Sequence, residues 1–109
     1  LADVLGDARV GADDRGELDS LLEHWRRQQG NYVEPIQRAS AAMSMALSPW
    51  YMRKHVPAPL EVLAFLRAAV GELELATMRE ATVVLRMAFA EEPRLVALFE
   101  QIDAMLVDW

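Results

Sequence analysis

The sequence predicts an all-α fold, a single helical bundle of five or six helices over residues 1–109. Two observations support this prediction. Apolar residues recur at intervals of three and four along most of the chain, which is the period of one face of an α-helix. Prolines also stand where helices are expected to begin, because a proline fits the first turn of a helix and disrupts its interior.

The first half of the chain divides into an arm and three helices. Residues 1–13 are mixed and acidic, and we interpret them as a short helix or a loosely held N-terminal arm. The spacing of apolar residues predicts a helix over 14–29. Pro35 is expected to begin the next helix, and Ser48 with Pro49 marks a short third helix, in which Ser48 would be the cap.

The second half predicts three more helical segments. Residues 56–59 contain two prolines and break the chain. A helical pattern runs over 60–73, where Gly71 is expected to kink or split it. Residues 82–90 are apolar on nearly every face and favour a buried helix, with a β-strand as the alternative because three β-branched residues begin the stretch. Pro93 is expected to open the terminal helix, 93–109.

Composition excludes several classes of function. The net charge of −6 argues against direct contact with nucleic acid by this segment, because duplex DNA requires a basic surface. The absence of cysteine excludes disulfides and thiol nucleophiles. No apolar run is long enough to span a membrane, and no signal-peptide pattern appears, so we expect a cytoplasmic domain. The arginine-rich composition, with Lys54 as the single lysine, favours a bacterial source.

No catalytic motif stands out, and the chain is predicted not to be an enzyme and to need no metal or cofactor. The two histidines, His24 and His55, are not spaced as metal ligands on a helix, and the sequence contains no glycine-rich phosphate-binding loop. The alternative is a haem protein, in which His55 would be the ligand.

Methionine and aromatic side chains gather in two parts of the sequence. Methionine fills irregular space, and tyrosine and tryptophan combine an apolar body with one polar group. A pocket for a hydrophobic small molecule is therefore one interpretation, and ordinary core filling is the other. The predicted pocket residues are Met43, Met45, Trp50, Tyr51, Met78, Met87 and Phe89.

The terminal helix carries an apolar row with the 3-4-3-4 spacing of helices that pair. Phe99 and Leu106 widen this row, so one side could face the core and the other a second chain, with Asp103 at the rim of the contact. The row is still in progress at Trp109, and we expect the segment to belong to something longer. The predicted homodimer interface comprises Leu95, Leu98, Ile102, Met105 and Trp109.

The stretch from Pro59 to Leu106 resembles the C-terminal regulatory domain of TetR-family transcriptional regulators. There an amphipathic helix leads to a mostly apolar helix, and an acidic break with a proline precedes a helix of the type P-x-L-x-x-L-F, here Pro93, Leu95, Leu98 and Phe99. The resemblance implies a homodimer with a hydrophobic effector pocket. The family's N-terminal helix-turn-helix has no counterpart in residues 1–56.

A competing resemblance is to helical sensor domains of the RsbR type, which have a globin-like fold and end in a long helix directed toward an output domain. Both resemblances imply a bacterial, dimeric and regulatory helical domain. The sequence therefore predicts a non-enzymatic regulatory domain that dimerises through its terminal helix and binds a hydrophobic small molecule. The alternatives are the globin-like sensor, a haem-binding bundle and a structural bundle that docks a partner protein.

Overall fold

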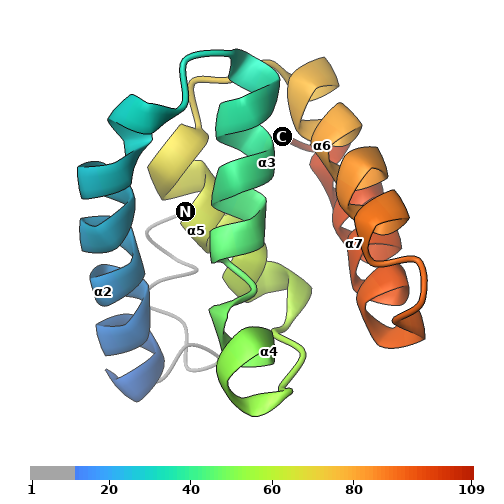
Figure 1. Cartoon of the computed structure of the whole chain (residues 1–109), viewed down its shortest axis with the longest axis horizontal. Helices are drawn as coiled ribbons and strands as arrows, with labels where there is room; N and C mark the ends of the chain where they lie inside the picture. Colours follow the sequence, from blue (N-terminus) through green and yellow to red (C-terminus); the bar gives the residue numbers. More distant parts are fainter. Residues whose placement is uncertain (1–11) are drawn as a thin grey trace.

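The computed structural model describes residues 12–109, with side chains from Leu18 onward, and confirms the all-α prediction (Figure 1). Within this range the chain forms six α-helices and one short 3-10 helix, and no strand. The elements are α2 (Ala12–Gln28), η1 (Gln29–Asn31), α3 (Pro35–Met45), α4 (Ser48–Arg53), α5 (Pro59–Val70), α6 (Leu75–Ala88) and α7 (Pro93–Leu106). The N-terminal arm expected over residues 1–13 lies almost wholly outside the described residues.

The helix starts predicted at Pro35 and Pro93 are confirmed, and the helix predicted from residue 60 begins one residue earlier, within the predicted break. Pro35, Pro59 and Pro93 are the first residues of α3, α5 and α7. The fixed φ of proline suits the first turn, and its missing N–H is one that the helix could not have used. Proline therefore determines the residue at which each of these helices begins.

The start of α4 differs from the prediction. Leu47 occupies the N-cap position, and no side chain caps the helix. The Ser48 hydroxyl instead donates a hydrogen bond of 2.8 Å to the carbonyl oxygen of Met45, at the end of α3. The predicted capping role of Ser48 is therefore wrong, because its hydroxyl ties α4 back to the preceding helix.

The break between α5 and α6 falls where glycine permits it. Helix α5 ends at Val70, Gly71 is its C-cap residue, and α6 begins at Leu75. A side chain at Gly71 would press against the carbonyl oxygen of Arg67 in the last turn of α5, so glycine permits the close approach of this residue to the end of the helix. The strand alternative for the start of residues 82–90 is wrong, since α6 runs unbroken to Ala88.

The bundle places α3 between α2 and α6, with α5 and α7 behind them (Figure 1). Helix α3 packs on both α5 and α6, and α7 packs mainly on α6 and also on α5. Each long helix contributes fully buried side chains to one core, among them Phe65, Met43 and Phe99. Burial of such a side chain stabilises the fold by about 1.5–3 kcal/mol, which makes this core the main source of stability.

Trp25 is the largest side chain that α2 contributes to the core of the bundle. Trp25 is 2% exposed, and its indole N–H donates a 3.2 Å hydrogen bond to the carbonyl oxygen of Ala69 on α5. Tyr32 stacks on the same ring, with 5.9 Å between ring centroids. The large apolar area and the satisfied N–H together hold α2 against α5.

No helix described between residues 12 and 109 is long and apolar enough to cross a lipid bilayer.

Candidate ligand-binding groove

The predicted dimer row on α7 faces the interior of its own domain. Leu95 and Ile102 are 0% exposed and Leu98 is 3% exposed, so these three side chains are in the core and are not available to a second chain in this fold. Only Met105, which is 36% exposed, and the half-buried Trp109 reach the surface. This corrects the predicted interface, because the row that resembled a pairing helix packs against α6 and α5.

Phe99 and Leu106, which widen the apolar face of α7, are also fully buried. The predicted second, outward-facing side of α7 is therefore core as well. The prediction placed Asp103 at the rim of an intermolecular contact. In the structure its carboxylate instead binds a side chain of α6 in the same chain.

Arg79 and Thr82 of α6 and Asp103 of α7 form a polar cluster that we call the α6–α7 clasp. The Arg79 guanidinium donates hydrogen bonds of 3.0 Å and 3.2 Å to the two carboxylate oxygens of Asp103. The buried Thr82 hydroxyl lies 2.6 Å from the Arg79 carbonyl oxygen, to which it donates, and 3.3 Å from Asp103. The hydrogen bond from Arg79 holds the pKa of Asp103 below its usual value, although partial burial opposes this. The clasp supports the packing of α6 on α7.

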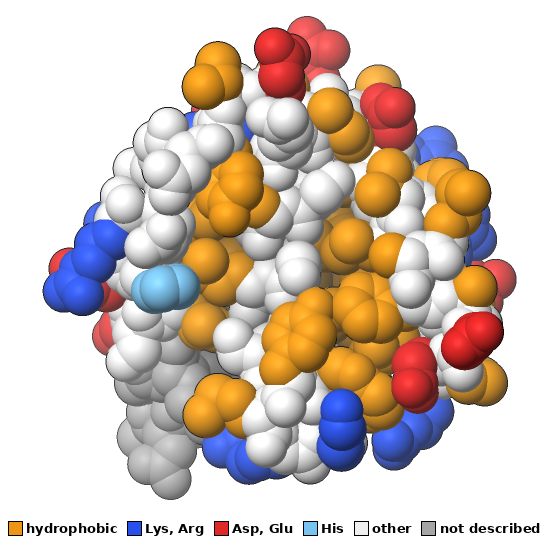
Figure 2. All heavy atoms as spheres, in the orientation of Figure 1, with side chains coloured by type: hydrophobic (Ala, Val, Ile, Leu, Met, Phe, Trp, Pro, Cys, Tyr) orange, Lys and Arg blue, Asp and Glu red, His pale blue; other side chains and the backbone are white. Residues whose placement is uncertain are grey.

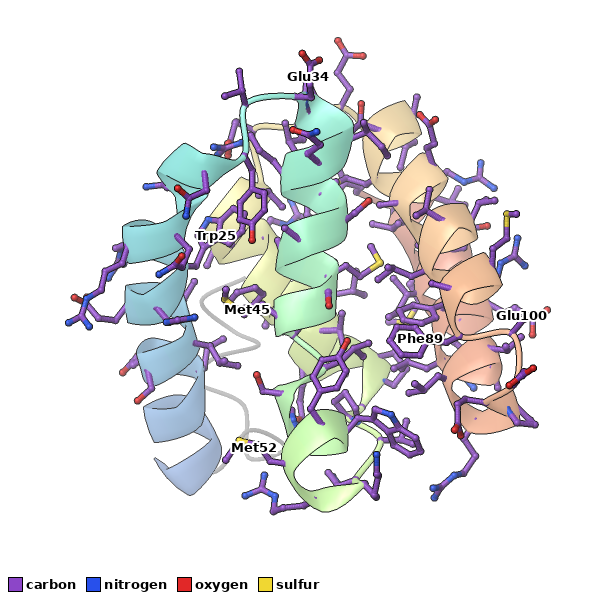
Figure 3. The ribbon with its side chains drawn as sticks, viewed as in Figure 1. Trp25, Glu34, Met45, Met52, Phe89 and Glu100 are labelled. Carbon is purple, nitrogen blue, oxygen red and sulfur yellow. The ribbon has the colours of Figure 1, made fainter. Side chains whose placement is uncertain are left out.

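The seven residues predicted to line one hydrophobic pocket are divided between the core and the surface. Met43 and Met78 are fully buried and fill the core. Met87 is 75% exposed on α6. Figure 3 shows Met45 and Phe89 on opposite sides of α3. The prediction is corrected at this point, and core filling accounts for Met43 and Met78.

Three of the seven lie on α4 or against it. Figure 2 shows apolar side chains at the surface in the lower centre of the molecule, over this part of the bundle. The rings of Tyr51 and Phe89 lie 6.3 Å apart, and Phe89 continues to Phe99 at 6.2 Å. Trp50, 5% exposed, is contacted by two cations, with Lys54 5.1 Å and Arg94 5.0 Å from its ring. These contacts attach α4 to α6 and α7.

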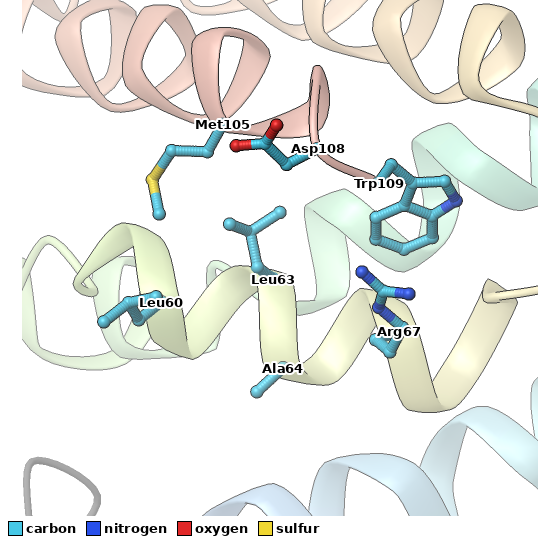
Figure 4. A pocket seen from close by; sticks show the side chains of 7 residues that line it. All are labelled: Leu60, Leu63, Ala64, Arg67, Met105, Asp108 and Trp109. Atoms are coloured by element: carbon cyan, nitrogen blue, oxygen red, sulfur yellow. The ribbon is translucent and has the colours of Figure 1, made fainter. Parts of the chain in front are cut away.

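A groove lies elsewhere, between α5 and the C-terminal end of α7 (Figure 4). Its volume is about 380 Å³, within the range of small-molecule sites. Both surface residues of the α7 row contribute to its wall. The lining residues are Leu60, Leu63, Ala64, Arg67, Met105, Asp108 and Trp109.

The walls of the groove combine an apolar surface with two opposite charges. Arg67 rises from α5, and its guanidinium lies 4.5 Å from the centre of the Trp109 ring (Figure 4). The Trp109 indole N–H donates a 3.4 Å hydrogen bond to the carbonyl oxygen of Leu73, beyond the end of α5. Asp108 lies on the α7 side. No ion pair joins Arg67 or Asp108 to another described residue.

The sequence contained a signal for the α5 side of this groove. Leu60, Leu63, Ala64 and Arg67 are spaced by three, one and three residues, so they share one face of a helix. Of these, Leu60 and Leu63 remain only half-buried in the folded chain. The α7 side carried no such signal, because Asp108 and Trp109 follow the last turn of α7 and their positions depend on tertiary packing.

The histidine predicted as a haem ligand in the alternative hypothesis does not line the groove. His55 is exposed just after α4 and is not among the lining residues. Among the residues that the structure describes, no three His, Cys, Asp or Glu side chains form a group that could hold a metal ion.

No family model, no curated protein and no solved structure matches this chain. The resemblances to TetR-family regulatory domains and to RsbR-type sensor domains therefore stay predictions, and the geometry of the groove is the starting point for the function.

Proposed function

We propose that this chain is a non-enzymatic, small-molecule-binding regulatory domain whose ligand occupies the groove between α5 and α7. The single observation that carries the proposal is the groove itself, about 380 Å³ in volume and lined by Leu60, Leu63, Ala64 and Met105 beside two charged residues. Mostly apolar walls with a few polar groups are typical of sites that bind small molecules.

The position of the groove suggests how binding would be transmitted. Met105 lies in the last turn of α7 and Trp109 follows it, while Ile102 and Leu98, one and two turns before Met105, are buried in the core. A ligand that bridges α5 and the end of α7 would therefore favour the docked position of α7 over any displaced one. A ligand can shift a regulatory domain between two conformations only if it binds one of them more tightly than the other.

The test uses 8-anilinonaphthalene-1-sulfonate, an apolar anionic dye, as the probe. We expect saturable binding by dye fluorescence and a rise in melting temperature, because a ligand that binds only the folded state stabilises it by about 2.7 kcal/mol at 100 times its Kd. Absence of saturable binding to the folded chain would overturn the proposal.

A matched pair of variants locates the binding. Leu60→Asp places a carboxylate in the groove near the start of α5, and Leu75→Asp places one at the start of α6, outside the groove. Both positions lie in a first helical turn, where a carboxylate is tolerated by the helix dipole. Leu60→Asp is expected to weaken dye binding strongly, and Leu75→Asp to leave it unchanged. Equal effects would place the binding elsewhere.

Self-association is a second candidate function. The surface that favours it lies on α6, whereas the sequence predicted an interface on α7. Val83 and Val84 are each 42% exposed and Met87 is 75% exposed, and their spacing of three and four residues places them together on the outward side of α6. If the chain forms a homodimer, this face offers apolar area that α7 does not. Sedimentation of Val84→Glu tests it: a dimer that dissociates supports this face, and an unaltered dimer excludes it.

A further inference from the structure

We infer that the ligand of the α5–α7 groove is a small zwitterion with an aliphatic side chain, of the α-amino-acid class. The inference rests on the proposed function, since it names the chemistry of a ligand in the same groove. It follows from two charges of opposite sign that line one small apolar site, Arg67 and Asp108.

Arg67 is prepared to receive a carboxylate. Its guanidinium stacks at 4.5 Å on the Trp109 ring, and Trp109 is itself anchored through its indole N–H to the Leu73 carbonyl oxygen. Stacking occupies a face of the guanidinium and leaves the N–H donors at its edge, the geometry with which arginine grips a carboxylate by two hydrogen bonds. No described carboxylate pairs with this arginine.

Asp108 supplies the complementary charge. Figure 4 shows its carboxylate on the α7 side of the groove, above Leu63, with Arg67 on the α5 side. No described cation pairs with Asp108. A ligand with a carboxylate alone would meet repulsion from Asp108, and a ligand with an ammonium alone would meet repulsion from Arg67. A molecule that carries both charges satisfies the two residues at once.

The apolar part of the site selects the side chain of the ligand. Leu60, Leu63, Ala64 and Met105 present aliphatic and thioether surface, and methionine adapts to ligands of differing shape. The groove thus favours a branched or linear aliphatic side chain over a polar one, and leucine is the simplest probe with all three features.

The experiment compares three probes that differ only in their charges: L-leucine, 4-methylpentanoate, which lacks the ammonium, and 3-methylbutylamine, which lacks the carboxylate. Affinities are measured by NMR titration of the whole 109-residue chain. We expect L-leucine to bind about tenfold more tightly than either single-charge analogue, since each lost charge-assisted hydrogen bond weakens binding by roughly that factor. Equal affinities, or tighter binding of either analogue, would overturn the inference.

Two variants that each remove one charge test the role of that charge. Arg67→Gln is expected to remove the preference for L-leucine over the amine, and Asp108→Asn to remove the preference over the acid. Because both side chains are exposed, neither change should alter the melting temperature appreciably. Retained preferences in these folded variants would contradict the assignment.

The outcomes separate the two proposals. Binding of 8-anilinonaphthalene-1-sulfonate that is sensitive to Leu60→Asp, with no preference for L-leucine, would refute the zwitterion and leave the groove as an apolar site. Failure of the dye to bind would refute the proposed function, and the inference, which rests on it, would fall with it.

Discussion

Replacement of Ile102 by alanine tests whether α7 is a core helix. In the structure the Ile102 side chain is 0% exposed and belongs to the main apolar cluster. A helix that served chiefly to pair two chains would show the same 3-4 spacing, but truncation of this residue would then change the oligomeric state rather than the stability of the single chain.

The magnitude follows from the burial. Truncation of a fully buried aliphatic side chain to alanine costs about 2–5 kcal/mol, which combines the lost transfer energy with the cavity left behind. We expect about 3 kcal/mol for Ile102→Ala, a large part of the 5–15 kcal/mol typical of a folded domain. For a domain of this size the melting temperature would fall by about 12–24 °C.

The assay is urea denaturation and thermal unfolding, with Met105→Ala as the matched control. Met105 lies one turn further along the row and is 36% exposed, so its truncation should cost less than half as much. If Ile102→Ala were no more destabilising than Met105→Ala, the assignment of α7 to the core would be refuted.

Three further predictions concern the rest of the bundle. Asp103→Asn should destabilise the fold at neutral pH. Its folded-state pKa is lowered by Arg79, so the ion pair contributes fully above the unfolded value of about 3.9. That contribution disappears as pH falls through the still lower folded value, and the two unfolding curves should converge in acid. Lys54 has φ 55°, in the left-handed region. Lys54→Gly should therefore be more stable than Lys54→Ala by about 1 kcal/mol in chemical denaturation, although both lose the contact with Trp50; equal stabilities would contradict this. Gly71→Ala should lower the melting temperature, because the new Cβ meets a backbone carbonyl oxygen.

Much of the fold could be predicted because its signals are local. Prolines at the first positions of α3, α5 and α7 and a glycine after α5 act on their own backbone, so their effect is readable from the sequence. The failed prediction for Ser48 shows the limit, since a serine hydroxyl can bond the backbone before it as well as after it, and here it bonds the carbonyl oxygen of Met45, three residues earlier.

The candidate site was harder to predict because it depends on which helices meet. The apolar row of α7 looks the same whether it faces the protein's own core or a partner, and only the packing of α6 and α5 distinguishes the two. In the same way, nothing local indicated that Arg67 would lie beside Trp109, a residue far along the chain. Buried Met43 and Met78 resembled pocket residues because methionine suits both roles.

The most direct test of the groove uses the three tryptophans as separate reporters. Trp25 lies between α2 and α5, Trp50 in the aromatic cluster at α4, and Trp109 in the groove, and each gives one indole N–H signal in a two-dimensional NMR spectrum. On titration with 8-anilinonaphthalene-1-sulfonate, the Trp109 signal should shift progressively while those of Trp25 and Trp50 stay in place. A shift confined to Trp50, or no saturable shift of Trp109, would contradict the account.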